Sequence, residues 1–174
     1  MLGRLIERRL RAEEAHLGAS LDYLRHLLRL SRSAFFKFSL ITPVSRHRRA
    51  LPPGPYHVAR IVAVQDADCG TCLQIEVNLA READVPGSLL RALIEGRIGD
   101  LPPDLQDVAA FASSVAQADG EEDEWRPALL ERYGEEGVAE LALAIAMARV
   151  FPTLKRGLGY AKSCSLVQVE VDVQ

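Results

Sequence analysis

Two of the three cysteines in this 174-residue chain lie within one short stretch, DADCGTCLQIE, at residues 66–76. Cys69 and Cys72 are three residues apart, which places both thiols on the first turn of a helix if one begins there. Where structural disulfides rarely persist, as in a reducing cytoplasm, a close cysteine pair indicates redox chemistry or a metal site. Thiol chemistry is therefore the first hypothesis.

A glutamate shares the face of this predicted helix on which the cysteines lie. At 100° per residue, Cys69, Cys72 and Glu76 fall within an arc of about 60° that also carries leucines and alanines. A carboxylate on a buried face is costly unless it is paired, hydrogen-bonded or protonated. His57, on the apolar face of the preceding predicted helix, is the nearest candidate partner, and Arg60 flanks it one turn further on.

These residue types fit a redox-active thiol site. The positive end of a helix dipole lowers the pKa of thiols on the first turn. In a Cys-x-x-Cys pair, one sulfur can attack a substrate while the other resolves the adduct as a disulfide. A histidine with a buried acid can move protons to or from the sulfur. We interpret Cys72, Cys69, Glu76 and His57 as candidate catalytic residues, and expect no cofactor and no bound metal.

Other interpretations of the same residues remain open. Cys69 and Cys72 could simply pack as small apolar side chains. The two cysteines with His57 and Glu76 could also bind zinc, although a lone CxxC is a weak zinc signal. Cys164 lies beyond the last predicted helix and is interpreted as a packed or incidental thiol. A non-catalytic, oligomeric helical scaffold is the alternative to an enzyme.

The elements that would position these residues are almost all helices. Asp68 is expected to cap the cysteine helix, and Pro152 to kink or end the long apolar helix. Valines that alternate with polar residues from Val167 to Val173 predict a short C-terminal strand. We expect helices at residues 2–16, 20–40, 56–66, 69–83, 88–95, 105–118, 124–134 and 138–151.

The stretch ALPPGP at residues 50–55 predicts a boundary between an N-terminal arm of two helices, residues 1–50, and a helical core, residues 51–174. The arm has eleven Arg and Lys against four Asp and Glu, a charge of +7, whereas the remainder has ten against twenty, a charge of −10. We expect the arm to dock on the acidic body or a neighbouring subunit rather than on nucleic acid or anionic lipid.

Composition indicates one folded, soluble domain, with 48% hydrophobic and 26% charged residues. Charges at every second or third position exclude a signal-peptide core at the N-terminus. The apolar run at 138–151 is too short to span a bilayer and contains Glu140 and Arg149, so it predicts a buried core helix and no membrane span. An odd cysteine count favours a cytoplasmic protein over a secreted one.

Over about residues 51–160 the chain resembles the alkylhydroperoxidase D and carboxymuconolactone decarboxylase family. The likeness is carried by Cys69-Gly-Thr-Cys72 at a helix start, by AREADVPGSLLRALIEG and by ERYGEEGVAELALAIA. It implies an all-α domain, a trimer or hexamer, and a thiol-dependent peroxidase or disulfide oxidoreductase. It also implies a small peroxide or disulfide substrate and an external dithiol reductant of lipoyl or thioredoxin-like type.

In the peroxidase branch of that family, a glutamate precedes the CxxC motif by eleven intervening residues and a histidine follows its second cysteine by four. The resemblance implies that Cys72 attacks and Cys69 resolves. His57 stands where the family has glutamate, and Glu76 where it has histidine, while Thr71 replaces a further histidine. This exchange predicts a proton relay of reversed order, with the reservation that a carboxylate beside Cys72 raises the pKa of its thiol.

Overall fold

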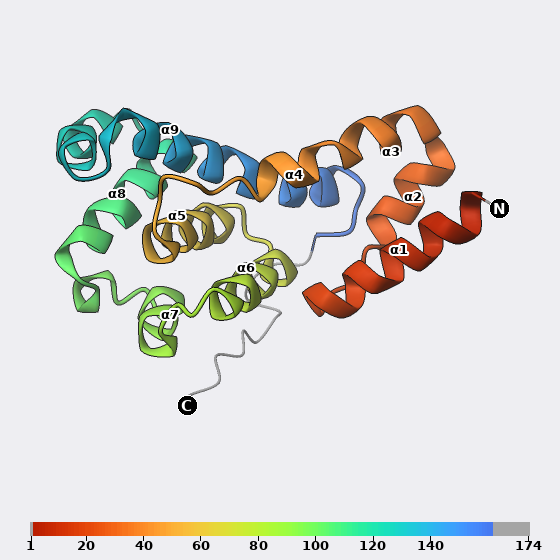
Figure 1. Ribbon diagram of the computed structural model, residues 1–174, viewed down its shortest axis with the longest axis horizontal. Helices are drawn as coiled ribbons and strands as arrows, with labels where there is room; N and C mark the ends of the chain where they lie inside the picture. The colour runs from red at the N-terminus through yellow and green to blue at the C-terminus, as the bar shows by residue number, and fades with distance from the viewer. Residues whose placement is uncertain (1, 162–174) are drawn as a thin grey trace.

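The computed structural model describes residues 2–161, and within them the secondary structure is helical, which confirms the predicted all-α class (Figure 1). The predicted C-terminal strand and Cys164 lie outside these residues. The helices are α1 (Leu2–Leu17), α2 (Asp22–Leu30), α3 (Arg32–Ser39), α4 (Ile41–Ser45), α5 (Pro53–Asp66), α6 (Gly70–Glu82), α7 (Gly87–Ile94), the 3₁₀ turn η1 (Ile98–Asp100), α8 (Pro103–Gln117) and α9 (Glu122–Gly157).

Helix α5 is the centre of the core. Its ten consecutive residues from Pro55 to Val64 are all buried, and α6, α7, α8 and α9 surround it (Figure 1). A helix buried on every side must also bury any polar residue it carries, here His57 and Arg60. The proline-rich boundary starts this helix: Pro53 is in the first turn, where a backbone N–H would have no helical partner.

Helix α6 begins one residue later than predicted, and its cap differs. Cys69 is the N-cap residue and provides no side-chain cap, so the prediction that Asp68 caps the helix is wrong. Asp68 instead takes a left-handed conformation, with φ of 47°, in the tight turn that joins α5 to α6. The turn thus places Cys69 and Cys72 directly after the central helix.

Helix α9 combines two predicted helices. Gly134, with φ of 68° and ψ of 178°, interrupts the helical backbone between them. Pro152 does not end the helix, which continues to Gly157. By length and composition alone α9 could cross a membrane, but Leu141, Ile145 and other members of its apolar face are buried in the core, and a core helix passes the same test.

The arm contains four helices, so the predicted two-helix arm is wrong. The first predicted helix corresponds to α1, but the second is divided into α2 and α3, and α4 follows it where no helix was predicted. Ser31 is extended, and its hydroxyl accepts the N–H of Ala34, which caps a new helix in mid-sequence. The arm has its own apolar cluster, formed by Leu10, Leu21, Tyr23 and Phe35 and packed against the end of α9.

A buried carboxylate of α9 fixes the segment between arm and core. Glu140, 4% exposed, accepts the backbone N–H groups of Arg49, Ala50 and Leu51, the last two at 2.7 and 2.8 Å. Three hydrogen bonds compensate the carboxylate for the loss of water. We call residues 49–51 the latch segment.

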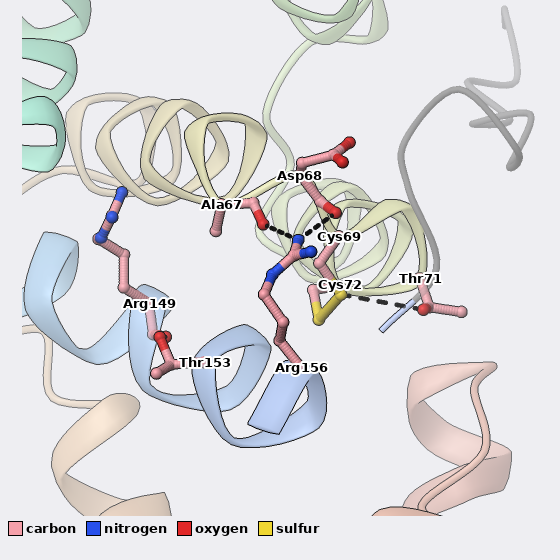
Figure 2. Close-up of a disulfide and its surroundings, with 8 residues drawn as sticks. All are labelled: Ala67, Asp68, Cys69, Thr71, Cys72, Arg149, Thr153 and Arg156. Carbon is pink, nitrogen blue, oxygen red and sulfur yellow. Dashed lines mark hydrogen bonds between the residues drawn. A yellow bond between two sulfur atoms is a disulfide. The ribbon is translucent and has the colours of Figure 1, made fainter. Parts of the chain in front are cut away.

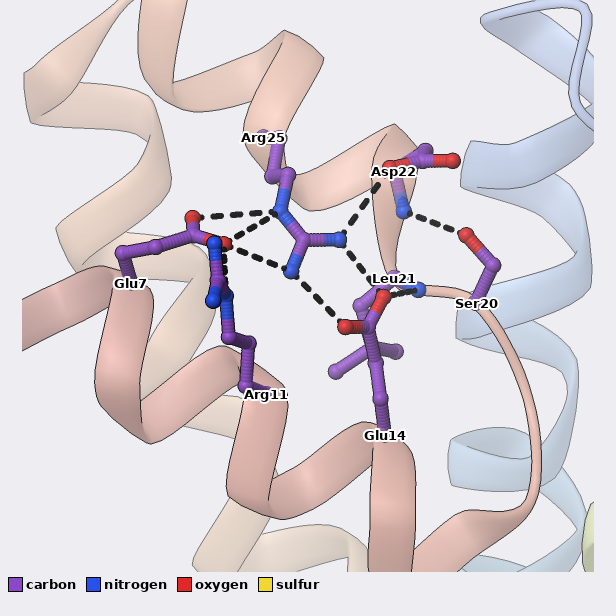
Figure 3. Close-up of polar contacts among 7 residues, drawn as sticks. All are labelled: Glu7, Arg11, Glu14, Ser20, Leu21, Asp22 and Arg25. Atoms are coloured by element: carbon purple, nitrogen blue, oxygen red, sulfur yellow. Dashed lines mark hydrogen bonds and ion pairs between the residues drawn. The ribbon is translucent and has the colours of Figure 1, made fainter.

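Part of the arm's positive charge is matched within the arm, where four acidic residues face eleven basic ones. Arg25 of α2 pairs with Glu7 and Glu14 of α1 (Figure 3), and Arg46 pairs with Glu13. In the described part of the chain, its charged contacts with the body are made by histidines, such as His16 with Glu82 at 3.7 Å. The arm does dock on the body, but through its apolar cluster and the latch segment rather than through opposite charge.

Candidate functional site

The two predicted redox cysteines are joined by a disulfide. Cys69 and Cys72 have Cα atoms 5.2 Å apart, at the start of α6 (Figure 2). Cys69 is fully buried, whereas Cys72 is 5% exposed and lines a cavity. The predicted proximity of the two sulfurs is confirmed, and their environments differ.

An arginine from the end of α9 holds the turn that precedes the cysteines. Arg156 donates from Nη2 to the carbonyl oxygens of Ala67 and Asp68, at 2.7 and 2.9 Å (Figure 2). These bonds tie the left-handed turn to a helix 88 residues away in sequence. Arg156 was not predicted from the sequence, because no local pattern indicates a contact between residues 88 positions apart.

The cavity lies between arm and core and has a volume of about 310 Å³. Helix α9 and the arm provide much of its apolar wall, while α5 and α6 provide His57, Arg60 and Glu76, and α9 adds Lys155. Of the four predicted site residues, His57, Cys72 and Glu76 line this cavity, and Cys69 does not. The residues most relevant to its chemistry are His57, Arg60, Cys72, Glu76 and Lys155, and the apolar wall includes Leu17, Leu21, Tyr23, Leu24, Ile75, Leu79, Ala148, Phe151 and Pro152.

Glu76 is buried as predicted, with 5% exposure, but its partner is Arg60. The Arg60 guanidinium donates from Nε and Nη2 to the two carboxylate oxygens, at 2.8 and 2.7 Å, and from Nη1 to the Ser45 carbonyl at 2.9 Å. Burial alone would lower the pKa of Arg60, but the pairing with Glu76 raises it overall. The guanidinium fork reaches both oxygens at once, which a single imidazole cannot do.

His57 lies beside this pair without bonding to it. Its ring packs edge-on against Tyr56 at 5.1 Å, and its buried Nδ1 has no hydrogen-bond partner. Burial lowers the pKa of His57 to about 4, although the charge of Glu76 acts in the opposite direction. The imidazole is thus neutral at pH 7. The expected direct contact between His57 and Glu76 is wrong, because Arg60 occupies the carboxylate.

The zinc interpretation finds no support in the geometry. Within residues 2–161, no three side chains of His, Cys, Asp or Glu lie together as a metal site would require. The cysteines are bonded to each other, and both oxygens of Glu76 accept from Arg60.

Lys155 is a second site residue that the sequence analysis missed. Its side chain lines the cavity, is 4% exposed, and places Nζ 5.2 Å from the ring centre of Tyr23. Lys155 follows Ala148 and Phe151 at helical spacings of seven and four, on the wall-forming face of α9. This spacing already indicates Lys155 as a wall residue. It was not predicted because Pro152 was expected to end or kink the helix before it.

No family model matches the sequence, and no curated protein matches it. The resemblance to the alkylhydroperoxidase D family therefore stays a prediction that depends on the cysteine motif and the helices around it.

Proposed function

We propose that this protein is a thiol-dependent oxidoreductase of the peroxidase type, in which Cys72 attacks the substrate and Cys69 resolves the adduct. The supporting observation is the asymmetry of the pair. Cys72 lies on the cavity wall, and Cys69 lies behind it, fully buried and within bonding distance. A substrate in the cavity meets one sulfur, and the second sulfur is protected from all but the first.

The proposed cycle oxidises the two thiols to a disulfide and then reduces them again. The Cys72 thiolate attacks the terminal oxygen of a hydroperoxide, so an S–O bond forms, the O–O bond breaks, and the released alkoxide takes up a proton as an alcohol. Cys72 is now a sulfenic acid. Cys69 attacks its sulfur, the disulfide forms, and the hydroxyl leaves as water with the proton of Cys69. An external dithiol, of lipoyl or thioredoxin-like type, returns two electrons and two protons.

His57 is proposed to move the proton in the first step. A neutral imidazole in the same cavity can accept the proton of the Cys72 thiol and return it to the leaving oxygen. Its pKa of about 4 keeps the ring neutral at pH 7 and makes it a weak base, so the proton it takes up is passed on readily to the leaving oxygen. Glu76 is not needed in this relay, because its charge is balanced by Arg60. That balance also weakens the expected effect of the carboxylate on the thiol.

Consumption of tert-butyl hydroperoxide with dithiothreitol as reductant tests this proposal. Cys72→Ser is expected to abolish turnover. Cys69→Ser, reduced and then freed of dithiothreitol, is expected to consume one equivalent of hydroperoxide and stop, with a sulfenic acid at Cys72 that dimedone traps. Cys164→Ser, which changes the third cysteine, is the matched control and should retain activity. Equal turnover by wild type and Cys72→Ser would refute the proposal.

The relay needs its own measurement. His57→Gln should slow alkylation of reduced Cys72 by iodoacetamide at pH 7, while Glu76→Gln tests whether the carboxylate contributes. If His57 acts without Glu76, the two substitutions combine additively. If the effects of the two substitutions are strongly non-additive, the result would instead support the reversed relay, in which His57 and Glu76 act as a unit.

We also propose that the protein assembles into a homo-oligomer, as the family resemblance implies. Among the residues that the structure describes, five of the six exposed large apolar side chains belong to the arm, and Leu40 is 70% exposed. Exposed apolar residues of this size are typical of surfaces that pack against a partner. Sedimentation analysis of wild type and of a Leu30→Glu/Leu40→Glu variant tests this; a monomeric wild type would refute it. The arm residues concerned are Leu5, Leu30, Phe36, Leu40 and Val44.

A further inference from the structure

The cavity contains a buried positive charge with no acidic partner. Lys155 is 4% exposed, and within residues 2–161 its ammonium group makes neither a hydrogen bond nor an ion pair. Its Nζ atom lies over the ring of Tyr23, 5.2 Å from the ring centre. Burial lowers its pKa to about 8, and no nearby carboxylate opposes that effect. An ammonium in such a place is costly unless something else supplies the negative charge.

The other cations on the cavity wall are already satisfied. Arg60 is neutralised by Glu76, and Arg46 by Glu13. Arg48 is exposed and donates to the carbonyl of Leu51. Lys155 is therefore the one buried cation, among the described residues of this wall, whose charge is left for a ligand.

The surroundings of Lys155 define the rest of the ligand. Leucines of the arm, Ile75 and Leu79 of α6, and Phe151 of α9 line the same space, with Cys72 also on its wall. A volume of about 310 Å³ is in the lower range for small-molecule sites. A molecule that fits must therefore combine one anionic group with an apolar chain.

We propose that this cavity binds an organic carboxylate with an apolar chain, whose carboxylate pairs with Lys155 while the chain extends along the apolar wall toward Cys72. The inference deepens the proposed function, and rests on it only for the identity of the reacting end: the substrate would be a carboxylate that carries a hydroperoxide or disulfide. The binding end is independent of thiol chemistry and can be tested without turnover.

Binding of octanoate and of octanamide to the oxidised, disulfide-bonded protein tests carboxylate recognition by Lys155 separately from thiol chemistry at Cys72. The pair has the same chain and nearly the same size, and only octanoate is charged. By calorimetry at pH 6.5, where Lys155 is protonated, octanoate should bind at least about tenfold more tightly than octanamide. Lys155→Met should abolish that preference and leave octanamide binding unchanged. Lys37→Met, which changes an exposed lysine outside the cavity, should retain it.

Three results would overturn the inference: equal binding of the two ligands by wild type, binding of neither, or a preference that survives Lys155→Met. If Lys155→Met does not fold, the wild-type preference alone decides. Placement next to the thiol is tested in the reduced Cys164→Ser protein, where octanoate should protect Cys72 from iodoacetamide. Binding without protection would refute the proposed orientation. A protein without peroxidase activity can still pass both tests, so the two proposals fail separately.

Discussion

Two arginines of this protein make ion pairs of similar geometry in very different surroundings. Arg25 in the arm faces Glu7, Glu14 and Asp22 with its side chain 20% exposed, and it bonds to Glu14 at 2.7 Å and to Glu7 at 3.0 Å (Figure 3). Arg60 in the core faces one carboxylate, and its side chain is 4% exposed. In the arm, water can replace a lost partner. In the core, a lost partner leaves a buried charge.

These two arginines show where this fold tolerates charge. The arm distributes several acids around one cation near solvent, and the interaction with Arg25 lowers the pKa of Glu14 to about 2. The core instead places most of its buried charged and titratable groups on one cavity wall, where Arg60 and Glu76 are matched while His57 and Lys155 are not, and it buries Glu140 separately against the latch segment. Stability measurements can therefore distinguish matched from unmatched groups.

The largest effect is expected from Arg60→Met. The substitution leaves Glu76 buried without its partner, which should lower the free energy of unfolding by about 3 to 5 kcal/mol. Urea unfolding at pH 7 measures the loss, and Arg60→Met/Glu76→Leu should recover most of it. A cost no greater than that of Arg25→Met would contradict the contrast between core and arm.

Acid should destabilise the protein through His57. Its pKa is about 4 in the folded state and 6.5 in the unfolded state, so between these values the unfolded chain binds a proton that the folded chain does not. The free energy of unfolding should thus fall by about 3 kcal/mol as pH drops from 6.5 to 4. Urea midpoints across this range should show a shallower slope for His57→Gln than for wild type. Identical slopes would mean that His57 titrates normally.

Lys155→Met should stabilise the protein. The pKa of Lys155 is about 8 when folded against 10.5 when unfolded, so wild type carries the cost of a buried charge below pH 8, and its stability rises from pH 8 to 10.5. After allowance for the lost contact with Tyr23, a gain of about 1 to 2 kcal/mol is expected at pH 7. The variant should also lack that rise at alkaline pH. A destabilised variant with the wild-type slope would show that the ammonium is already paired.

The smallest effect is expected in the arm. Arg25→Met removes the partner of Glu7 and Glu14, but both acids keep access to water, so a loss of about 1 kcal/mol is expected. The loss should shrink at high ionic strength, unlike that of Arg60→Met. Part of it should also vanish in acid, as Glu14 becomes protonated between pH 4.5 and 2. Thermal unfolding at low and high salt compares the two variants.

Local patterns in the sequence predicted much of this site. Helical spacing placed Cys69, Cys72 and Glu76 on one buried face, and the structure confirms both the sulfur pair and the burial of the acid. Composition and periodicity also predicted an all-helical chain. These features depend on residues within one or two turns of each other, which is the range that periodicity describes.

The remaining features depend on contacts between distant segments. Glu76 pairs with Arg60 rather than His57 because of the way α5 and α6 pack. Periodicity places both candidate partners on the same helix, so it cannot decide between them. Lys155 and Arg156 reach the site because α9 continues past Pro152 beside the α5–α6 turn. The division of the arm at Ser31 reflects a local cap that competes with helix propensity.

The latch segment gives the arm a significance beyond stability. Glu140 holds residues 49–51 in place, and the segments before them supply Leu17, Leu21, Tyr23 and Leu24 to the wall that encloses Cys72. The arm thus supplies part of the apolar wall of the cavity, whereas both sulfurs lie at the start of α6 in the core. In the proposed function the core would carry the thiol pair and Lys155, and the arm would contribute part of the apolar wall that contacts the substrate, so substitutions in the arm would alter substrate preference and leave the thiol pair in place.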